Sequence, residues 1–156
     1  MENVLVEVEK YVSSLLRNEL PHTFVYHNLG HTLRVIKSLK ELIESEKTKG
    51  KDAENLLIAG WFHDVGYIKG CENHEENSAK IAAEFLENKN LENERINNIK
   101  NLILATKMGY ELKNKLEGLI RDADCAHVSS KNYNDYTALL KKELELTQGK
   151  KFTKND

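Results

Sequence analysis

Residues 56–67 read LLIAGWFHDVGY, and in them two adjacent ionisable side chains, His63 and Asp64, follow the most apolar stretch of the chain. Its apolar residues lie almost all round a helix, which is typical of a central, buried helix. Burying two ionisable groups is costly unless they pair or bind a metal ion. Neighbours on a regular helix point about 100° apart, so both face one ion only where the helix ends, and Gly66 favours an end there.

The remaining sequence predicts an all-α fold. The 156 residues contain one proline and are rich in Leu, Glu, Lys, Ile and Ala, so we expect helix nearly throughout. Residues 1–150 are expected to form a single helical bundle of six or seven helices, and residues 151–156 a frayed tail. Asn28 and Asp52 are expected to cap two of the helices. The predicted helices cover roughly residues 3–18, 28–50, 52–66, 74–86, 96–105, 112–123 and 135–146.

Composition narrows the range of partners. The formal net charge of −2 argues against capture of a nucleic-acid polymer or an anionic membrane, which requires a basic face. Cys71 and Cys125 lack CxxC spacing, and neither a signal peptide nor a run of 18 apolar residues is recognisable. We therefore expect a cytoplasmic protein that acts on a small molecule. A homodimer stays open, because symmetric dimers are common among soluble proteins.

Two further residues at helix ends extend the HD pair. His31 is expected in the first turn of the second helix, and Asp124 closes the apolar segment LEGLIRDAD, residues 116–124. With His63 and Asp64 they give a mixed nitrogen and oxygen ligand set, which suits Mn²⁺, Fe²⁺, Ni²⁺, Co²⁺, Zn²⁺ or Mg²⁺. Four protein ligands leave open positions on an octahedral ion, as metal-assisted hydrolysis requires.

Five sequence blocks resemble, in order, those of small stand-alone proteins of the HD-domain superfamily, the metal-dependent phosphohydrolases with the signature H…HD…D. These blocks are YHNLGHTLRVIK, LLIAGWFHDVGY, NHEENSAKIAAEFL, LILATK and IRDADCAHV, which together span about residues 26–128. The resemblance implies an all-helical bundle and a divalent metal ion held by His31, His63, Asp64 and Asp124. It also implies attack of a metal-bound water on a small phosphorylated metabolite, with a nucleotide as the leading candidate.

The sequence departs from two branches of that superfamily. Tyr67 stands where some nucleotide-cleaving branches carry an acidic residue near the attacking water. Binuclear branches add two histidines, of which His74 is present, whereas Thr106 and Lys107 stand where the second is sought. We therefore expect a mononuclear or incompletely binuclear site with His74 facing the cleft. His74, as general acid or water-positioning group, and Lys107, as a phosphate contact, are the candidate catalytic residues.

Several alternatives stay open at this point. His74 is alternatively a helix-start residue that bonds to backbone, and Lys107 a solvated lysine. Arg34, one turn beyond His31, either faces the same cleft or pairs with a surface acid. His27 is expected to belong to the helix start, with the cleft entrance as its alternative place. The competing function is a non-catalytic sensor or interaction module that binds metal and nucleotide.

Overall fold

The computed structural model describes residues 3–152, except for the side chains of His127 and Ser129. Within this part of the chain the structure is all-helical, with seven α-helices, two short 3₁₀ helices and no strand, which confirms the predicted fold class. No helix there is both long and apolar enough to span a membrane. The predicted frayed tail lies largely outside the described residues. The elements are α1 (Val4–Asn18), α2 (Leu29–Ser45), α3 (Gly50–Phe62), η1 (Val65–Lys69), α4 (His74–Asn88), α5 (Asn93–Leu104), α6 (Lys115–Asp124), η2 (Ala126–Ser129) and α7 (Tyr133–Gln148).

Asparagine side chains fix the start of three helices. Asn28 caps α2, as predicted, by accepting a hydrogen bond from the backbone N–H of Gly30 at 3.0 Å. Asn3 and Asn114 cap α1 and α6 in the same way. The cap at Asn28 matters for function because it sets the first turn of α2, where His31 lies.

Other predicted boundaries are wrong by several residues. α2 ends at Ser45 rather than Gly50, and Lys47 just beyond it has a left-handed backbone with φ 55°. Asp52 is not an N-cap, because α3 already begins at Gly50 and Asp52 lies in its first turn. There its negative charge favours the positive end of the helix dipole.

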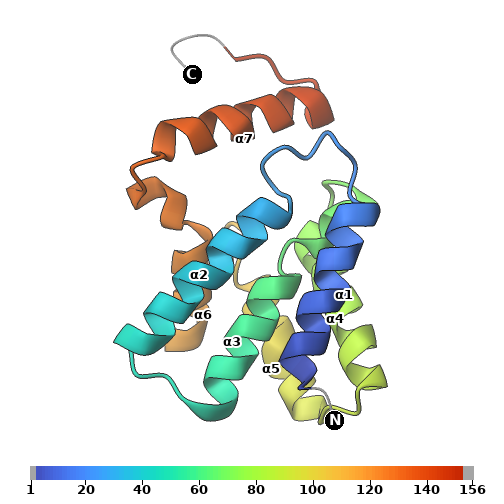
Figure 1. The fold of residues 1–156 in the computed structure, drawn as a ribbon, viewed down its shortest axis with the longest axis vertical. Coiled ribbons are helices and arrows are strands. Elements are labelled where there is room, and N and C mark those ends of the chain that lie inside the picture. The colour runs from blue at the N-terminus through green and yellow to red at the C-terminus, as the bar shows by residue number, and fades with distance from the viewer. Residues whose placement is uncertain (1–2, 153–156) are drawn as a thin grey trace.

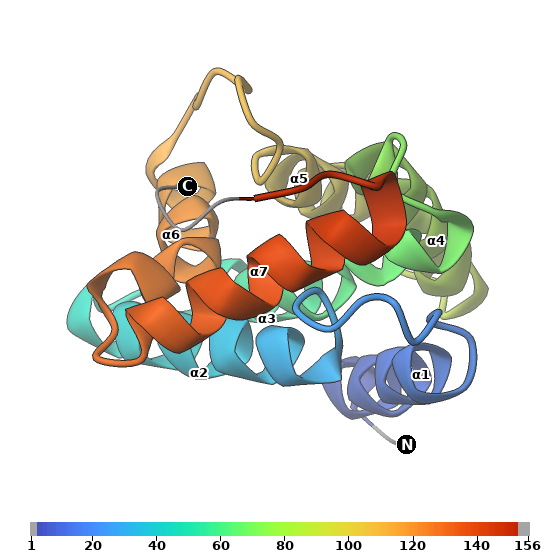
Figure 2. The ribbon, with the colours of Figure 1, turned by 90° about the horizontal axis from the view of Figure 1, so that it is seen from above.

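α3 is the central helix of the bundle, as its apolar sequence predicts. It packs against α1, α2, α4, α5 and α6, and Figure 1 shows it between the α2–α6 side and the α1–α4 side. Leu56, Ile58, Ala59 and Phe62 are fully buried on it. α7 is placed differently: it crosses one end of the bundle, as the two perpendicular views show (Figures 1 and 2).

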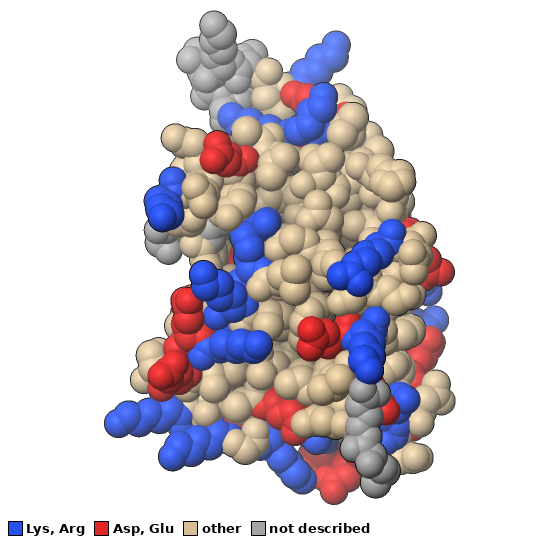
Figure 3. Space-filling view, in the orientation of Figure 1, with Lys and Arg blue, Asp and Glu red and all other residues tan. Residues whose placement is uncertain are grey.

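Basic and acidic side chains are interspersed on the face of the molecule that Figure 3 shows. This distribution agrees with the formal net charge of −2. The charge of a local site on the surface can therefore differ from the near-neutral net charge of the chain.

The turn after α3 requires a glycine for a packing reason. α3 ends at Phe62, four residues before Gly66, so Gly66 is not what ends it. Instead, η1 packs closely on α4, and the N–H of Gly66 donates to Ser78 Oγ at 2.8 Å. A Cβ on Gly66 would lie 2.0 Å from the carbonyl oxygen of His74. The absence of a side chain thus lets η1 and the start of α4 meet.

We predict that Gly66→Ala lowers the free energy of unfolding by at least about 2 kcal/mol, because the added methyl overlaps rigid backbone. Gly118→Ala is the matched control, since nothing lies within 4 Å of the added Cβ in α6. Alanine there should raise the stability by about 0.5–1 kcal/mol. Urea unfolding of both variants measures the difference, and equal effects would contradict the packing role of Gly66.

Candidate metal centre

Four ionisable side chains from three helix ends meet in the interior, and we call them the His–Asp cluster. His31 comes from the first turn of α2, Asp124 is the last residue of α6, and His63 and Asp64 directly follow α3. His63 is fully buried, and the side chain of Asp124 is the most exposed of the four at 23%. The cluster is therefore closed on the α3 side and reaches solvent beside Asp124.

The ligand atoms lie at the mutual distances that one ion requires. His31 Nε2 is 2.9 Å from Asp124 Oδ1, and the Nε2 atoms of His31 and His63 are 3.3 Å apart. Asp64 Oδ2 lies 3.2 Å and 3.1 Å from the same two nitrogens. Neighbouring ligands around an ion with bonds of about 2.1 Å are about 3 Å apart. All four ligand atoms lie within 4.8 Å of one another.

The lone pairs of the cluster also fit a cation. His63 Nδ1 donates to the carbonyl oxygen of Gly60 at 2.7 Å, which leaves a lone pair on Nε2 when the ring is neutral. Asp64 Oδ2 is buried and accepts no hydrogen bond from the described residues, although two imidazole nitrogens are close by. Carboxylate oxygen and imidazole nitrogen atoms that share one small volume fit the donor preferences of a divalent metal ion.

The pKa shifts within the cluster also fit a site for a cation. Burial alone would lower the pKa of His63, but the Asp64 and Asp124 carboxylates outweigh it and raise that pKa well above its usual value. Burial would raise the pKa of Asp64, but His63 and His31 outweigh it and hold that pKa well below its usual value. Without an ion, protons on the imidazoles balance the carboxylates. A cation held by these four residues would take over that role.

The structure places His74 beside the cluster and shows no hydrogen bond or ion pair of Lys107 with the four cluster residues. His74 Nε2 is 3.5 Å from Asp64 Oδ1, and the ring stacks on that of Tyr67 with centroids 4.0 Å apart. Lys107 pairs with Glu76 instead, and its side chain is 44% exposed. The role of Lys107 as a phosphate contact stays a prediction.

The sequence prediction gave His27 a place at the cleft entrance only as an alternative, and it did not identify the partner of His27, Glu143. Glu143 is a buried carboxylate of α7 that accepts hydrogen bonds from the backbone N–H groups of Tyr26 and His27, at 3.0 Å and 2.7 Å. Its other oxygen lies 2.5 Å from His27 Nδ1. The ring of His27 stacks on Tyr67 and lies edge-on to that of His31, with centroids 5.5 Å apart. His27 thus lines the site rather than only starting α2.

Only a weak signal in the sequence points to Glu143. One side of α7 is partly or fully buried, and its residues recur at helical spacing: Tyr136, Leu140, Glu143 and Thr147. A glutamate on such a side is a reason to search for a buried partner. The partner is more than 100 positions away, so the sequence pattern cannot name it.

Comparison with known proteins gives one match. The family model described as HD domain matches residues 28–129, about two thirds of the chain. The matched range contains the whole His–Asp cluster, His74 and Lys107, but neither His27 nor α7. No curated protein and no solved structure matches the chain at a significant level.

We predict that Mn²⁺ raises the melting temperature of the chelator-treated protein, because the ion binds only the folded cluster. At a metal concentration of 100 times Kd the stabilisation is about 2.7 kcal/mol. Asp124→Asn should abolish most of the shift. Asp122→Asn is the matched control, because Asp122 is exposed on the same helix. A metal shift that is equal in both variants would contradict the ligand assignment.

We predict that Glu143→Gln lowers the free energy of unfolding by about 1–3 kcal/mol, because the amide cannot replace a carboxylate that accepts three hydrogen bonds. Glu145→Gln is the control on the same helix, where the exposed side chain pairs with Lys142 at 3.8 Å. Its effect should be within about 0.5 kcal/mol. Thermal unfolding measures both, and similar losses would show that Glu143 holds nothing specific.

Proposed function

The chain belongs to the HD-domain family, and we propose that it is a metal-dependent phosphohydrolase. Its substrate would be a phosphoester of a small phosphorylated metabolite, with a nucleotide as the leading candidate. One observation carries the proposal: two imidazoles and two carboxylates from three helix ends direct ligand atoms into a volume that fits one ion. A buried polar cluster of this kind is expensive to retain for stability alone.

The four residues of the His–Asp cluster would hold the ion, and the donor set admits Mn²⁺, Fe²⁺, Ni²⁺, Co²⁺, Zn²⁺ or Mg²⁺. Such an ion, when bound, supplies a Lewis acid that polarises a phosphoryl oxygen and lowers the pKa of water. His31 and Asp124 line a pocket on the open side of the cluster, whereas His63 is fully buried. We therefore infer that the substrate approaches past Asp124.

His27 is our candidate proton donor to the leaving oxygen. Glu143 accepts from Nδ1 of His27, so that nitrogen carries a proton and Nε2 remains to exchange one with the substrate. A histidine oriented by a buried carboxylate is a common arrangement for proton transfer. His74, beside Asp64, is our candidate for orienting the attacking water or extending the ligand set.

The test is an assay of the chelator-treated chain, supplemented with each ion in turn, on nucleoside mono-, di- and triphosphates and on p-nitrophenyl phosphate. We expect turnover that depends on the ion and is abolished by Asp64→Asn. His27→Gln should lower kcat by about 10²–10⁴-fold. It should leave the metal-induced rise in melting temperature unchanged, because His27 is outside the His–Asp cluster.

His22→Gln is the matched control, because His22 is exposed in the same loop before α2. Its kcat should equal that of the unmodified chain. Absence of turnover with every ion and substrate, despite a metal-induced rise in melting temperature, would contradict the hydrolase. Tight binding of an intact nucleotide in that case would instead support the non-catalytic sensor.

A further inference from the structure

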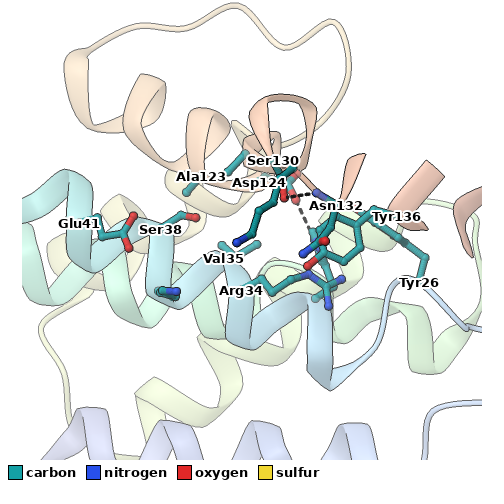
Figure 4. A pocket seen from close by; sticks show the side chains of 14 residues that line it. Tyr26, Arg34, Val35, Ser38, Glu41, Ala123, Asp124, Ser130, Asn132 and Tyr136 are labelled. Atoms are coloured by element: carbon teal, nitrogen blue, oxygen red, sulfur yellow. Dashed lines mark hydrogen bonds and ion pairs between the residues drawn. The ribbon is translucent and has the colours of Figure 1, made fainter. Parts of the chain in front are cut away.

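A pocket of about 290 Å³ lies beside the His–Asp cluster, between α2, the end of α6 and the start of α7 (Figure 4). His31 and Asp124 form part of its wall, so the pocket continues directly from the open side of the cluster. Its lining also contains three basic side chains, Arg34, Lys37 and Lys131. A molecule held at the cluster therefore extends into a basic environment.

Arg34 is held in place by aromatic rings, and its side chain donates no hydrogen bond to the part of the chain that the structure describes. Its guanidinium carbon lies 4.3 Å from the ring centroid of Tyr136 and 5.9 Å from that of Tyr26. Stacking uses the flat faces of a guanidinium and leaves its N–H edge free. No carboxylate of the described residues lies within ion-pair distance of it. Arg34 is thus a preorganised donor for an oxyanion.

The other two cations of the pocket also lack acidic partners. Neither Lys37 nor Lys131 takes part in an ion pair with the described residues, and Glu41 is the one acidic residue of the lining besides Asp124. Elsewhere, basic side chains such as Lys107 and Arg95 pair with glutamates. Three cations against two carboxylates leave the lining with a net positive charge, which favours an anion.

The spacing of His31 and Arg34 along α2 allows one ligand to reach both the His–Asp cluster and the guanidinium. Arg34 follows His31 by three residues on α2, and side chains at this spacing lie on the same face of a helix. Because Arg34 covers a face of the Tyr136 ring, the pocket offers an oxyanion donor rather than a free aromatic face for a base.

We propose that this pocket binds a second phosphate of the substrate, distinct from the phosphoester that is cleaved at the His–Asp cluster. The substrate class is thus a metabolite with two phosphate groups. This inference rests on the proposed hydrolysis at the cluster for its role, but binding of a doubly charged ligand can be measured without turnover.

The experiment is a calorimetric titration of the Mn²⁺-loaded full chain with alkane diphosphonates of one to four methylene groups, each compared with the corresponding alkyl monophosphonate. We expect at least one diphosphonate to bind about tenfold more tightly than its monophosphonate, as an added charged hydrogen bond implies. The affinity of this diphosphonate divided by that of its monophosphonate is the measured ratio. Arg34→Gln should reduce this ratio to about the value found for the diphosphonate that binds most weakly, and Lys131→Gln should reduce it partly.

Lys40→Gln is the matched control, because Lys40 is an exposed cation of α2 that is not part of the pocket lining. Lys131→Gln guards against a loss caused by misfolding, since it removes a side chain with no ion pair or hydrogen bond to the described residues. No preference for any diphosphonate, or a preference that both variants retain, would overturn the inference. Arg34-dependent binding without hydrolysis of any phosphoester would contradict only the proposed hydrolase.

Discussion

The burial of His63 and Asp64 at the end of α3 is the constraint on which the rest of the structure depends. An ionised group inside a protein costs several kcal/mol unless opposite charges surround it. The compensating groups, His31 and Asp124, come from α2 and α6, so the ends of three helices must meet at one point. Asp64 has left the helix, with φ −112° and ψ 4°, and this break lets two neighbouring side chains face the same volume.

A second buried carboxylate determines how α7 covers that point. Glu143 accepts hydrogen bonds from the backbone just before α2 and from the ring of His27. An isolated carboxylate in that position would be costly, so the contacts of Glu143 favour docking of α7 onto the segment at residues 26–27. A helix that looks polar in sequence is therefore tied to the site by one central polar residue rather than by an apolar side.

Local patterns in the sequence predict the parts of the structure that depend on neighbours along the chain. Helical periodicity gives the all-α fold, Asn28 is recognisable as a cap, and the apolar run before His63 identifies the central helix. The left-handed backbone at Lys47 has no comparable signal, because glycine is the residue that normally marks such a position. The pairing of His27 with Glu143 joins residues 116 positions apart, and no local pattern contains that distance.

The surroundings of the His–Asp cluster come from both the matched and the unmatched parts of the chain. The His–Asp cluster lies within residues 28–129, whereas Glu143, Tyr136 and Lys131 lie beyond them. The wall of the basic pocket thus comes partly from the same helix that holds His27. Tyr136 of α7 lies over the guanidinium of Arg34 in that pocket, and Glu143 of the same helix bonds to the ring of His27. One helix therefore contacts both a cation of the pocket and the histidine whose ring lies edge-on to that of His31.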